Sequence, residues 1–347
     1  MGEASDYAYL DTRVSLFASR LLQDRDIERL IEAGDPEGRP PGWLGDAIGL
    51  DGEGLTGIDR SLMPRILSEL SILLRALYRE DRALLRYWAT RFELANLKTL
   101  LRGKMTGSSY ETLRAQLVRL GGFCRVSLET LLLSSDTAEL LRQLEHSPYA
   151  DFARDMRRSL NQQQELFTID ATIDRHYFAG LAARARSVSG DAHTLIGTMI
   201  DRVNLVWLLR YRFSYELPPA QAYYLLIPTG YRLSHETLIE LTRLDSLERV
   251  LEALPPPFQQ ILQGARSASE VTRRLEYHNW ECALRILHGR RFNPTRALAY
   301  MILRERDLRR IRAVVRGHRL EMDPRLIRVA TGLANVDEIA PTAKEVA

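Results

Sequence analysis

An internal repeat constrains the fold of this chain more than any other feature. The segment Phe92 to Lys104, FELANLKTLLRGK, aligns without a gap with Ile200 to Arg212, IDRVNLVWLLRYR, at an offset of 108 residues. The identical pairs are Asn96 and Asn204, Leu97 and Leu205, Leu100 and Leu208, Leu101 and Leu209, and Arg102 and Arg210. A second block follows in the same order, because RVSLETL (residues 125–131) matches RLSHETL (residues 232–238). Two matched blocks in one order predict two copies of one structural unit.

A weaker third copy lies between Ile302 and His318. Asp307 and Leu308 stand there in the positions of Asn96 and Leu97. The period is far longer than the roughly 20–50 residues of solenoid repeats, so each copy is expected to be a small multi-helix lobe. We therefore predict three related, pseudo-symmetric helical lobes, covering residues 1–112, 113–222 and 223–347, the last with a polar C-terminal tail.

The fold class follows from the spacing of the apolar residues. They recur at intervals of three and four, which is the period of an amphipathic helix, and strand-like alternation is scarce. An example is the set Ile66, Leu67, Leu70, Leu73, Leu74 and Leu77. We predict an all-α protein. The longest interruption, from Ala33 to Gly57, is rich in Gly and Pro and is expected to form an exposed loop or paired turns.

The residues shared by the copies are expected to set architecture. Asn is a mediocre helix former, so we expect the amides of Asn96 and Asn204 to bond a neighbouring backbone group, with ligand binding as the alternative. Ser127 and Ser234 are placed to cap the next helix, which puts the glutamates that follow them in its electropositive first turn. The predicted signature of the repeat is Asn96, Leu97, Arg102, Glu129, Asn204, Leu205, Arg210, Glu236, Asp307 and Leu308.

Motifs that would indicate chemistry are absent from the sequence. The stretch GLDGEGLTG (residues 49–57) lacks the ending of a phosphate loop and the acidic spacing of a calcium loop. The seven histidines are scattered, and Cys124 and Cys282 are isolated, which argues against a zinc site or a disulfide framework. Ser189 near His193 could serve a hydrolase, but no GxSxG elbow surrounds it. We predict no catalytic residue, no cofactor and no metal.

Charge and hydropathy exclude some partners and leave others open. Lys and Arg number 48 against 45 Asp and Glu, so a net charge of +3 does not require nucleic acid. The N-terminus is acidic rather than signal-like, and no apolar run reaches about 18 residues, the length needed to span a membrane. A soluble or peripheral protein is expected.

The segment from Arg304 to Arg319 is rich in arginine and has two interpretations. Leu308, Ile311 and Val315 form a core-facing stripe, which favours a solvated helix face over a polyanion site. Such a face could bind another protein subunit or anionic lipid headgroups. The candidate residues for this contact are Arg306, Arg309, Arg310, Arg312 and Arg316. An Arg-rich helical nucleic-acid-binding protein is the alternative function.

Three short motifs resemble one family. The start YAYLDTRV (residues 7–14) is similar to that family's Y-x-Y-x-N-A-R-V, and NLKTLLRGK (residues 96–104) and NLVWLLR (residues 204–210) recur in the expected order. With these motifs the chain resembles the C subunits of the bacterial and archaeal V/A-type rotary ATPases, the counterparts of the d subunits in eukaryotic vacuolar ATPases. Asp11 and Thr12 depart from the family's Asn-Ala, and the third copy has lost the Asn-Leu…Leu-Leu-Arg pattern.

The resemblance implies a fold and a function. The three lobes would form a funnel or socket on the cytoplasmic end of the membrane rotor ring, and the central stalk would insert into it. The partners would be the shaft subunits and the proteolipid ring of the same ATPase, with only peripheral contact to the membrane face and with no nucleic acid or small-molecule substrate. Such a subunit is non-catalytic and transmits torque during ion transport.

Overall fold

The computed structural model describes residues 2–32, 54–160, 166–289 and 292–334. These residues form helices and connecting turns, and no strand occurs among them, so the predicted all-α class is confirmed. In the first half of the chain the helices are α1 (Gly2–Ala18), α2 (Asp24–Glu32), α4 (Gly54–Ala76), α5 (Arg79–Met105), α6 (Tyr110–Gln116), α7 (Leu128–Leu132), α8 (Thr137–Leu144) and α9 (Ala150–Leu160), with a 3₁₀ turn η1 (Gly121–Phe123).

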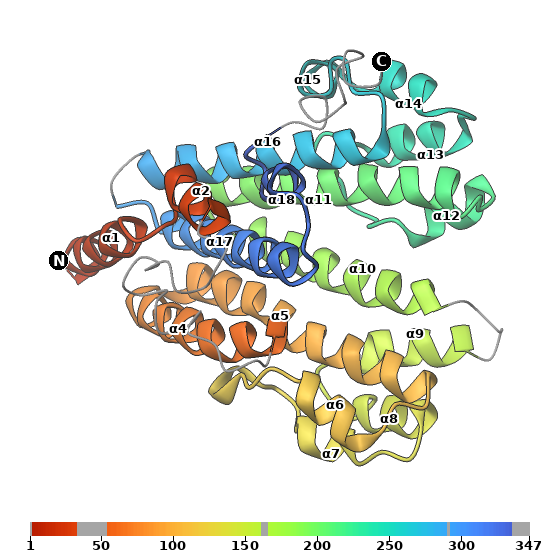
Figure 1. Ribbon diagram of the computed structural model, residues 1–347, viewed down its shortest axis with the longest axis horizontal. Helices are drawn as coiled ribbons and strands as arrows, with labels where there is room; N and C mark the ends of the chain where they lie inside the picture. The colour runs from red at the N-terminus through yellow and green to blue at the C-terminus, as the bar shows by residue number, and fades with distance from the viewer. Residues whose placement is uncertain (1, 33–53, 161–165, 290–291, 335–347) are drawn as a thin grey trace.

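The second half of the chain is also helical. Its helices are α10 (Leu166–Ala185), α11 (Gly190–Leu209), α12 (Pro219–Leu225), α13 (His235–Arg243), α14 (Leu247–Ala253), α15 (Pro256–Ile261), α16 (Ala268–His288), α17 (Thr295–Arg319) and α18 (Pro324–Thr331). A π-helical segment, η2 (Arg210–Ser214), extends α11. The long helices occupy the middle of the molecule, and the short helices α6–α8 and α13–α15 lie at opposite ends (Figure 1).

The repeat copies lie on three long helices, α5, α11 and α17. In α5 the apolar residues that recur every three or four positions are buried, among them Leu94, Leu97, Leu100 and Leu101. The carboxylates of Glu80 and Asp81 in the first turn and the cations of Arg102 and Lys104 in the last complement the helix dipole. The same order of elements follows the first two copies: α6, a turn and α7 after α5, and α12, a turn and α13 after α11.

The buried apolar residues form two cores. The larger core extends over α1 to α11 and the C-terminal helices, and includes Trp88 and Tyr300, both fully buried. The smaller core joins α10 and α11 to α12–α16, with Leu208, Leu241 and Leu275 among its members. The second copy therefore has a core of its own beside the common one.

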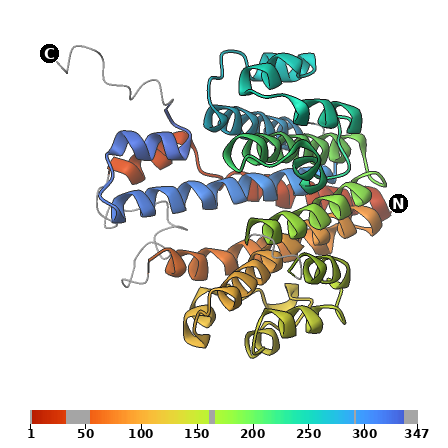
Figure 2. The ribbon, with the colours of Figure 1, turned by 90° about the vertical axis from the view of Figure 1, so that its right-hand side faces the viewer.

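The two ends of the described chain pack together. Helix α2 contacts both α17 and α18, and α1 contacts α4 and α17. Figure 2 shows α2 lying beside α18 above the last turns of α17. The N-terminal helices thus pack on the helix that carries the third copy. The predicted boundaries at residues 112/113 and 222/223, and the funnel arrangement of the lobes, stay predictions.

The prediction of a loop from Ala33 to Gly57 is partly wrong. Helix α4 begins at Gly54, so residues 54–57 are helical. The helix tolerates Gly54 and Gly57 in its first turn because apolar residues that recur every three or four positions, from Leu62 to Leu77, are buried and stabilise it by packing. The remainder of that stretch, residues 33–53, and the tail from residue 335 lie outside the described residues.

Candidate functional site

The amides of Asn96 and Asn204 tie the long helices to the turns that follow them. On α5, Asn96 Nδ2 donates to the carbonyl oxygen of Val118 at 2.8 Å, and its Oδ1 accepts from the Val118 N–H at 3.0 Å. On α11, Asn204 makes the same pair of bonds with Ile227, at 3.2 and 2.8 Å. An amide offers a donor and an acceptor side by side, so each Asn closes a ring with the backbone of one residue. The predicted backbone bonding is confirmed, and we call each ring an asparagine clamp.

Both clamps are shielded from water. Asn96 is 3% exposed and Asn204 is fully buried. Buried polar groups that lose a partner cannot turn to solvent, so each amide and the backbone groups facing it depend on one another. The arrangement serves to position the turn on the helix.

A buried carboxylate three residues before each Asn adds a second attachment, which the sequence analysis did not identify. Glu93 Oε1 accepts from the N–H groups of Arg125 and Val126, at 2.6 and 3.0 Å. Asp201 Oδ2 accepts from Arg232 N–H at 2.7 Å. The signal was present, because Glu93 and Asp201 align at the same offset as the asparagines.

Asp201 also receives two further backbone groups. Its Oδ1 accepts from Tyr231 N–H at 2.9 Å and from Leu233 N–H at 3.3 Å. Burial raises the pKa of Asp201, and the three backbone N–H donors partly offset that rise because they favour the charged form. Gly230 completes this turn: a Cβ there would lie 1.7 Å from the carbonyl oxygen of Leu233, so only glycine fits the observed backbone.

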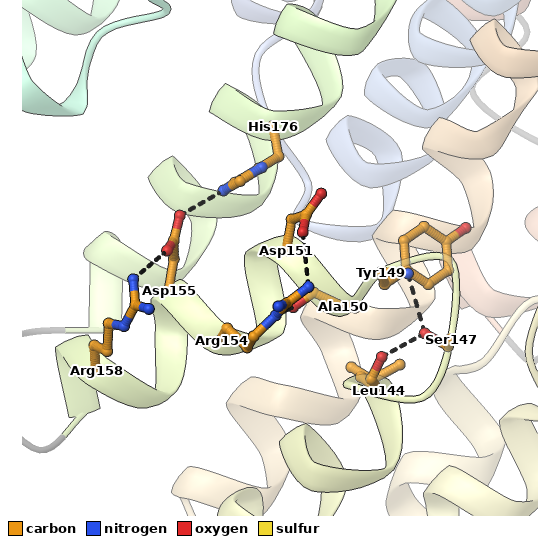
Figure 3. A network of polar contacts seen from close by, with 9 residues as sticks. All are labelled: Leu144, Ser147, Tyr149, Ala150, Asp151, Arg154, Asp155, Arg158 and His176. Carbon is orange, nitrogen blue, oxygen red and sulfur yellow. Dashed lines mark hydrogen bonds and ion pairs between the residues drawn. The ribbon is translucent and has the colours of Figure 1, made fainter.

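In the first copy, a tyrosine supplies the further donor. The Tyr149 hydroxyl donates to Glu93 Oε2 in the buried interior. Figure 3 shows how Tyr149 is held: Ser147 Oγ donates to the Leu144 carbonyl oxygen at 2.6 Å and accepts from Tyr149 N–H at 3.1 Å. Burial and the neighbouring Glu93 carboxylate raise the pKa of Tyr149, so the phenol stays a neutral donor.

The predicted helix caps are confirmed. Ser127 Oγ accepts from Thr130 N–H, and Ser234 Oγ accepts from Thr237 N–H, each at 3.2 Å. Glu129 and Glu236 lie in the first turns of α7 and α13. A hydrogen bond from its own backbone N–H and another from the Ser234 hydroxyl, at 2.9 Å, lower the pKa of Glu236.

The remaining signature residues divide into two kinds. Leu97, Leu205 and Leu308 are buried in the cores. The arginines at the helix ends differ, since Arg102 pairs with Asp170 at 3.1 Å while Arg210 lies over the Tyr215 ring. The leucines therefore play equivalent roles in the copies and the arginines do not.

The third copy uses its clamp position differently. Asp307 Oδ2 accepts from the N–H of Leu22, which lies between α1 and α2, at 3.1 Å. The position of Glu93 and Asp201 is taken by Arg304, whose Nε lies 3.2 Å from Glu69 Oε2 and whose Nη1 lies 3.5 Å from Asp307 Oδ2. The turn held by α17 thus comes from the N-terminal segment of the chain rather than from the residues that follow α17.

Side chains from all three repeat helices meet in one ionic cluster, formed by Arg91, Arg202, Glu276, Glu305 and Arg309. Glu305 on α17 pairs with Arg91 of α5 at 2.9 Å and with Arg309 at 3.3 Å. Glu276 on α16 pairs with Arg202 of α11 at 3.3 Å and with Arg309 at 3.1 Å. Arg309 therefore links the two carboxylates, and through them the cluster connects α5, α11 and α17.

The electrostatics of this ionic cluster favour its charged form. Burial alone would raise the pKa of Glu305, but Arg91, Arg309 and Arg202 together hold it below its ordinary value. Burial lowers the pKa of Arg202 to about 10, against the opposing effect of Glu276. Glu305 and Arg202 are thus charged at neutral pH, and their side chains are 13% and 17% exposed, whereas that of Arg309 is 39% exposed.

The arginines between Arg304 and Arg319, which were predicted to form one solvated face, range from buried to exposed. Arg304 and Arg310 are 4% and 3% exposed. Arg310 bonds the Thr331 carbonyl oxygen at 3.1 Å and Asp24 at 2.7 Å, and Arg306 lies over the Trp280 ring. Arg309 belongs to the ionic cluster and Arg312 is half-buried, while Arg316 is exposed. That prediction is wrong for Arg304 and Arg310, because packing of α4 and α2 on α17 buries their side chains and pairs them with Glu69 and Asp24, residues distant in sequence.

The candidate hydrolase residues have structural contacts. Ser189 Oγ caps α11 by accepting from Ala192 N–H and lies 2.8 Å from Thr295 Oγ1. The His193 ring packs edge-on against Tyr231. Within the described ranges, no group of three or more His, Cys, Asp or Glu side chains could hold a metal ion. No described helix is long and apolar enough to cross a membrane.

Comparison with known proteins identifies relatives of this chain. The chain is 21% identical to the C subunit of the A-type ATP synthase of Methanocaldococcus jannaschii over 347 aligned residues, covering 94% of this chain and 86% of the relative. It is 24% identical to the C subunit of the A-type ATP synthase of Methanosarcina mazei, covering 94% and 92%. The C subunit of the V-type ATP synthase of Thermus thermophilus is 25% identical over 58% of this chain and 62% of its own length.

The family model of the ATP synthase (C/AC39) subunit matches residues 10–329, which include all three repeat helices. The family resemblance found in the repeat motifs is thereby confirmed, and the chain belongs to the ATP synthase (C/AC39) subunit family.

Proposed function

We propose that this chain is a non-catalytic central-stalk subunit of a V/A-type ATPase or ATP synthase, which couples the central shaft to the membrane proteolipid ring. The observation that carries the proposal is the family match over residues 10–329, together with relatives named as C subunits that align along most of the chain. Its role would be to transmit torque during ion transport. As a member of this family it is a subunit of the rotary complex rather than its catalytic part.

The proposal includes a location and a set of partners. The subunit would lie on the cytoplasmic face of the membrane as a peripheral component, bound to the shaft subunits and to the proteolipid ring. The three lobes would surround a pseudo-threefold axis, with the shaft entering the socket between them.

Three features of the structure support a mechanical role. A part that transmits torque has to resist relative movement of its own elements, which requires dense packing and fixed polar contacts. The ionic cluster connects α5, α11 and α17, and the asparagine clamps attach a turn to α5 and to α11. Contacts between the chain ends attach α2 to α17. Each feature joins elements that would otherwise shift under load.

The test is to isolate the complex that contains this chain. The full chain carrying an affinity tag is purified from detergent-solubilised membranes, crosslinked, and its neighbours are identified by mass spectrometry, with untagged cells as the control. We expect crosslinks to shaft subunits and to the proteolipid ring. Recovery of a complex without either kind of subunit would overturn the proposal.

A further inference from the structure

The connections between consecutive long helices gather at one end of the molecule. They join α4 to α5, α10 to α11 and α16 to α17. Ser189 Oγ lies 2.8 Å from Thr295 Oγ1, so the start of α11 lies beside the start of α17. The Arg184 guanidinium lies 3.8 Å from the centre of the Tyr87 ring, which places the end of α10 beside the first turns of α5. The three connections therefore form one face of the protein, which we call the hairpin face.

Helix α1 borders the hairpin face. The Phe292 N–H, just before α17, donates to Asp11 Oδ1 at 3.4 Å, and Asp11 pairs with Arg296. Arg296 also bonds Ser15 Oγ of α1 at 3.3 Å. Figure 1 shows α1 and the start of α17 at the same end of the molecule. The N-terminal helix thus widens the face formed by the three connections.

The hairpin face carries an excess of positive charge. Residues 75–86 hold four arginines against two carboxylates, and residues 184–193 hold two arginines against one carboxylate. That last carboxylate, Asp191, accepts a hydrogen bond from Asn293 at 2.6 Å. All six arginines are exposed, and we call them the hairpin arginines: Arg75, Arg79, Arg82, Arg86, Arg184 and Arg186.

The hairpin arginines differ from exposed arginines elsewhere in the chain. Within the part of the chain that the structure describes, no carboxylate forms an ion pair with any of them. On the short helices α8, α9 and α14, by contrast, Arg142, Arg154 and Arg249 pair with carboxylates on their own helix or its first flanking residues, at 3.1, 2.9 and 3.3 Å. The positive charge of the hairpin face is therefore left for an anionic surface outside the chain.

Large apolar side chains are exposed on the same face. Tyr78, between α4 and α5, is 45% exposed, and Phe292 is 57% exposed. On α1, Tyr9 and Leu16 are 47% and 44% exposed. Tyrosines and arginines suit the headgroup layer of a bilayer, because their apolar parts can enter the acyl boundary while their polar ends stay among the phosphates. A nucleic acid would engage the arginines but leave Leu16 in water, so the combination favours a bilayer.

We propose that the hairpin face rests on the headgroups of an anionic lipid bilayer, with the hairpin arginines at the phosphates and the exposed apolar side chains at the acyl boundary. This inference rests on the proposed place of the subunit at the membrane, and it adds which end of the molecule faces the lipid. It also replaces the arginines of α17 as the lipid contact, because Arg306, Arg309 and Arg310 are engaged inside the protein.

Vesicle binding by the purified full chain tests the proposal. The chain is titrated with vesicles of phosphatidylcholine containing about one third phosphatidylglycerol, and with vesicles of phosphatidylcholine alone, at low and at high salt. We expect binding to the anionic vesicles at low salt, weakened at least about tenfold by high salt and at least about tenfold by removal of the anionic lipid. Equal binding to the two kinds of vesicle, or no binding to either, would overturn the proposal.

A triple variant identifies the arginines responsible. Arg79→Gln, Arg82→Gln and Arg86→Gln combined should weaken binding about 100-fold, because each arginine near an anionic surface contributes about fivefold. The matched control combines Arg142→Gln, Arg154→Gln and Arg249→Gln, which removes the same charge from paired sites, and it should bind within about threefold of the wild-type chain. Equal losses in the two triple variants would mean that net charge alone drives binding, and would overturn the assignment to this face.

A single-stranded RNA oligonucleotide is the competing ligand. We expect it to leave vesicle binding unchanged. If RNA displaced the vesicles and lost its affinity in the Arg79, Arg82 and Arg86 variant, the hairpin face would be a nucleic-acid site and the proposal would fail. Loss of vesicle binding by a chain that still crosslinks to shaft and proteolipid subunits would refute this lipid contact and leave the proposed coupling function intact.

Discussion

Asn204 closes a ring of two hydrogen bonds with Ile227, 23 residues further along the chain, and both residues are fully buried. Replacing Asn204 by Ala leaves one N–H and one carbonyl oxygen of the turn without partners. Because water cannot reach them, we expect the free energy of unfolding to fall by about 2 to 4 kcal/mol. Urea unfolding followed by circular dichroism measures the change.

The control for this variant is a side-chain amide whose hydrogen bond is exposed. Gln259 Nε2 donates to the Glu252 carbonyl oxygen at 3.0 Å on the surface, where water can replace the lost bond. Gln259→Ala should therefore cost less than about 1 kcal/mol. Equal losses in the two variants would show that the asparagine clamp contributes nothing beyond an ordinary surface hydrogen bond.

Gly230 and Gly122 occupy corresponding places before the matched blocks but differ in their surroundings. A Cβ at Gly230 would lie 1.7 Å from the Leu233 carbonyl oxygen, whereas nothing lies within 4 Å of one at Gly122. Gly230→Ala must displace the backbone that Asp201 holds, and we expect a loss of about 2 kcal/mol or more. Gly122→Ala should be close to neutral. Thermal unfolding of both variants measures the two losses. An unchanged stability in Gly230→Ala would contradict the close approach of the Leu233 carbonyl oxygen to residue 230.

Tyr149→Phe removes one donor from the buried Glu93 carboxylate. The other partners of Glu93, the N–H groups of Arg125 and Val126, remain. We expect the free energy of unfolding to fall by about 1 to 3 kcal/mol, because one carboxylate oxygen then lacks a partner. Tyr224→Phe, at a residue 65% exposed, is the matched control and should have little effect. Chemical unfolding of the two variants side by side is the measurement, and equal stabilities would contradict the assigned role of the phenol.

Glu305→Gln tests the ionic cluster. The substitution leaves Arg91 and Arg309 facing an uncharged group in a site where the Glu305 side chain is only 13% exposed. We expect a loss of about 2 kcal/mol at neutral pH, with less loss in acid. The pKa of Glu305 is lowered by its three arginines, so its stabilisation is present above its ordinary pKa of 4.5 and disappears as pH falls through the folded value.

The control for this variant is an exposed ion pair. Asp151 and Arg154 form one on α9, with side-chain exposures of 84% and 54% (Figure 3). Asp151→Asn should change stability by less than about 1 kcal/mol. Unfolding curves are recorded from pH 3 to pH 8. Of the two variants, only Glu305→Gln should differ from the wild-type chain by a free energy of unfolding that changes with pH. A difference independent of pH would mean that packing, rather than charge, explains the loss.

How far the sequence predicts this structure depends on the distance between the partners. The helical period, the caps at Ser127 and Ser234, and the backbone bonds of Asn96 and Asn204 could be predicted, because each depends on neighbouring residues or on the repeat. Glu93 and Asp201 carried a usable signal, since they align at the same offset and differ only in side-chain length.

Contacts between distant segments could not be predicted. Arg310 looks like part of a solvated basic face until Asp24, 286 residues away, is placed beside it. The same holds for Arg304 and Glu69, which are 235 residues apart. The sequence shows where each charged residue stands but not which distant helix will pack over it. The pairs Arg310–Asp24 and Arg304–Glu69 therefore depend on tertiary packing.

The packing of α1 and α2 on α17 also imposes an order on biosynthesis. A ribosome releases the N-terminal helices first, while the helices that cover Ile27 and Ile31 emerge only near the end of translation. Until then α2 lacks its partners α17 and α18, whereas α1 can already pack on α4. A prematurely terminated product keeps the apolar face of α2 exposed to chaperones and proteases, so the contact between the two ends forms only when synthesis has reached α17 and α18.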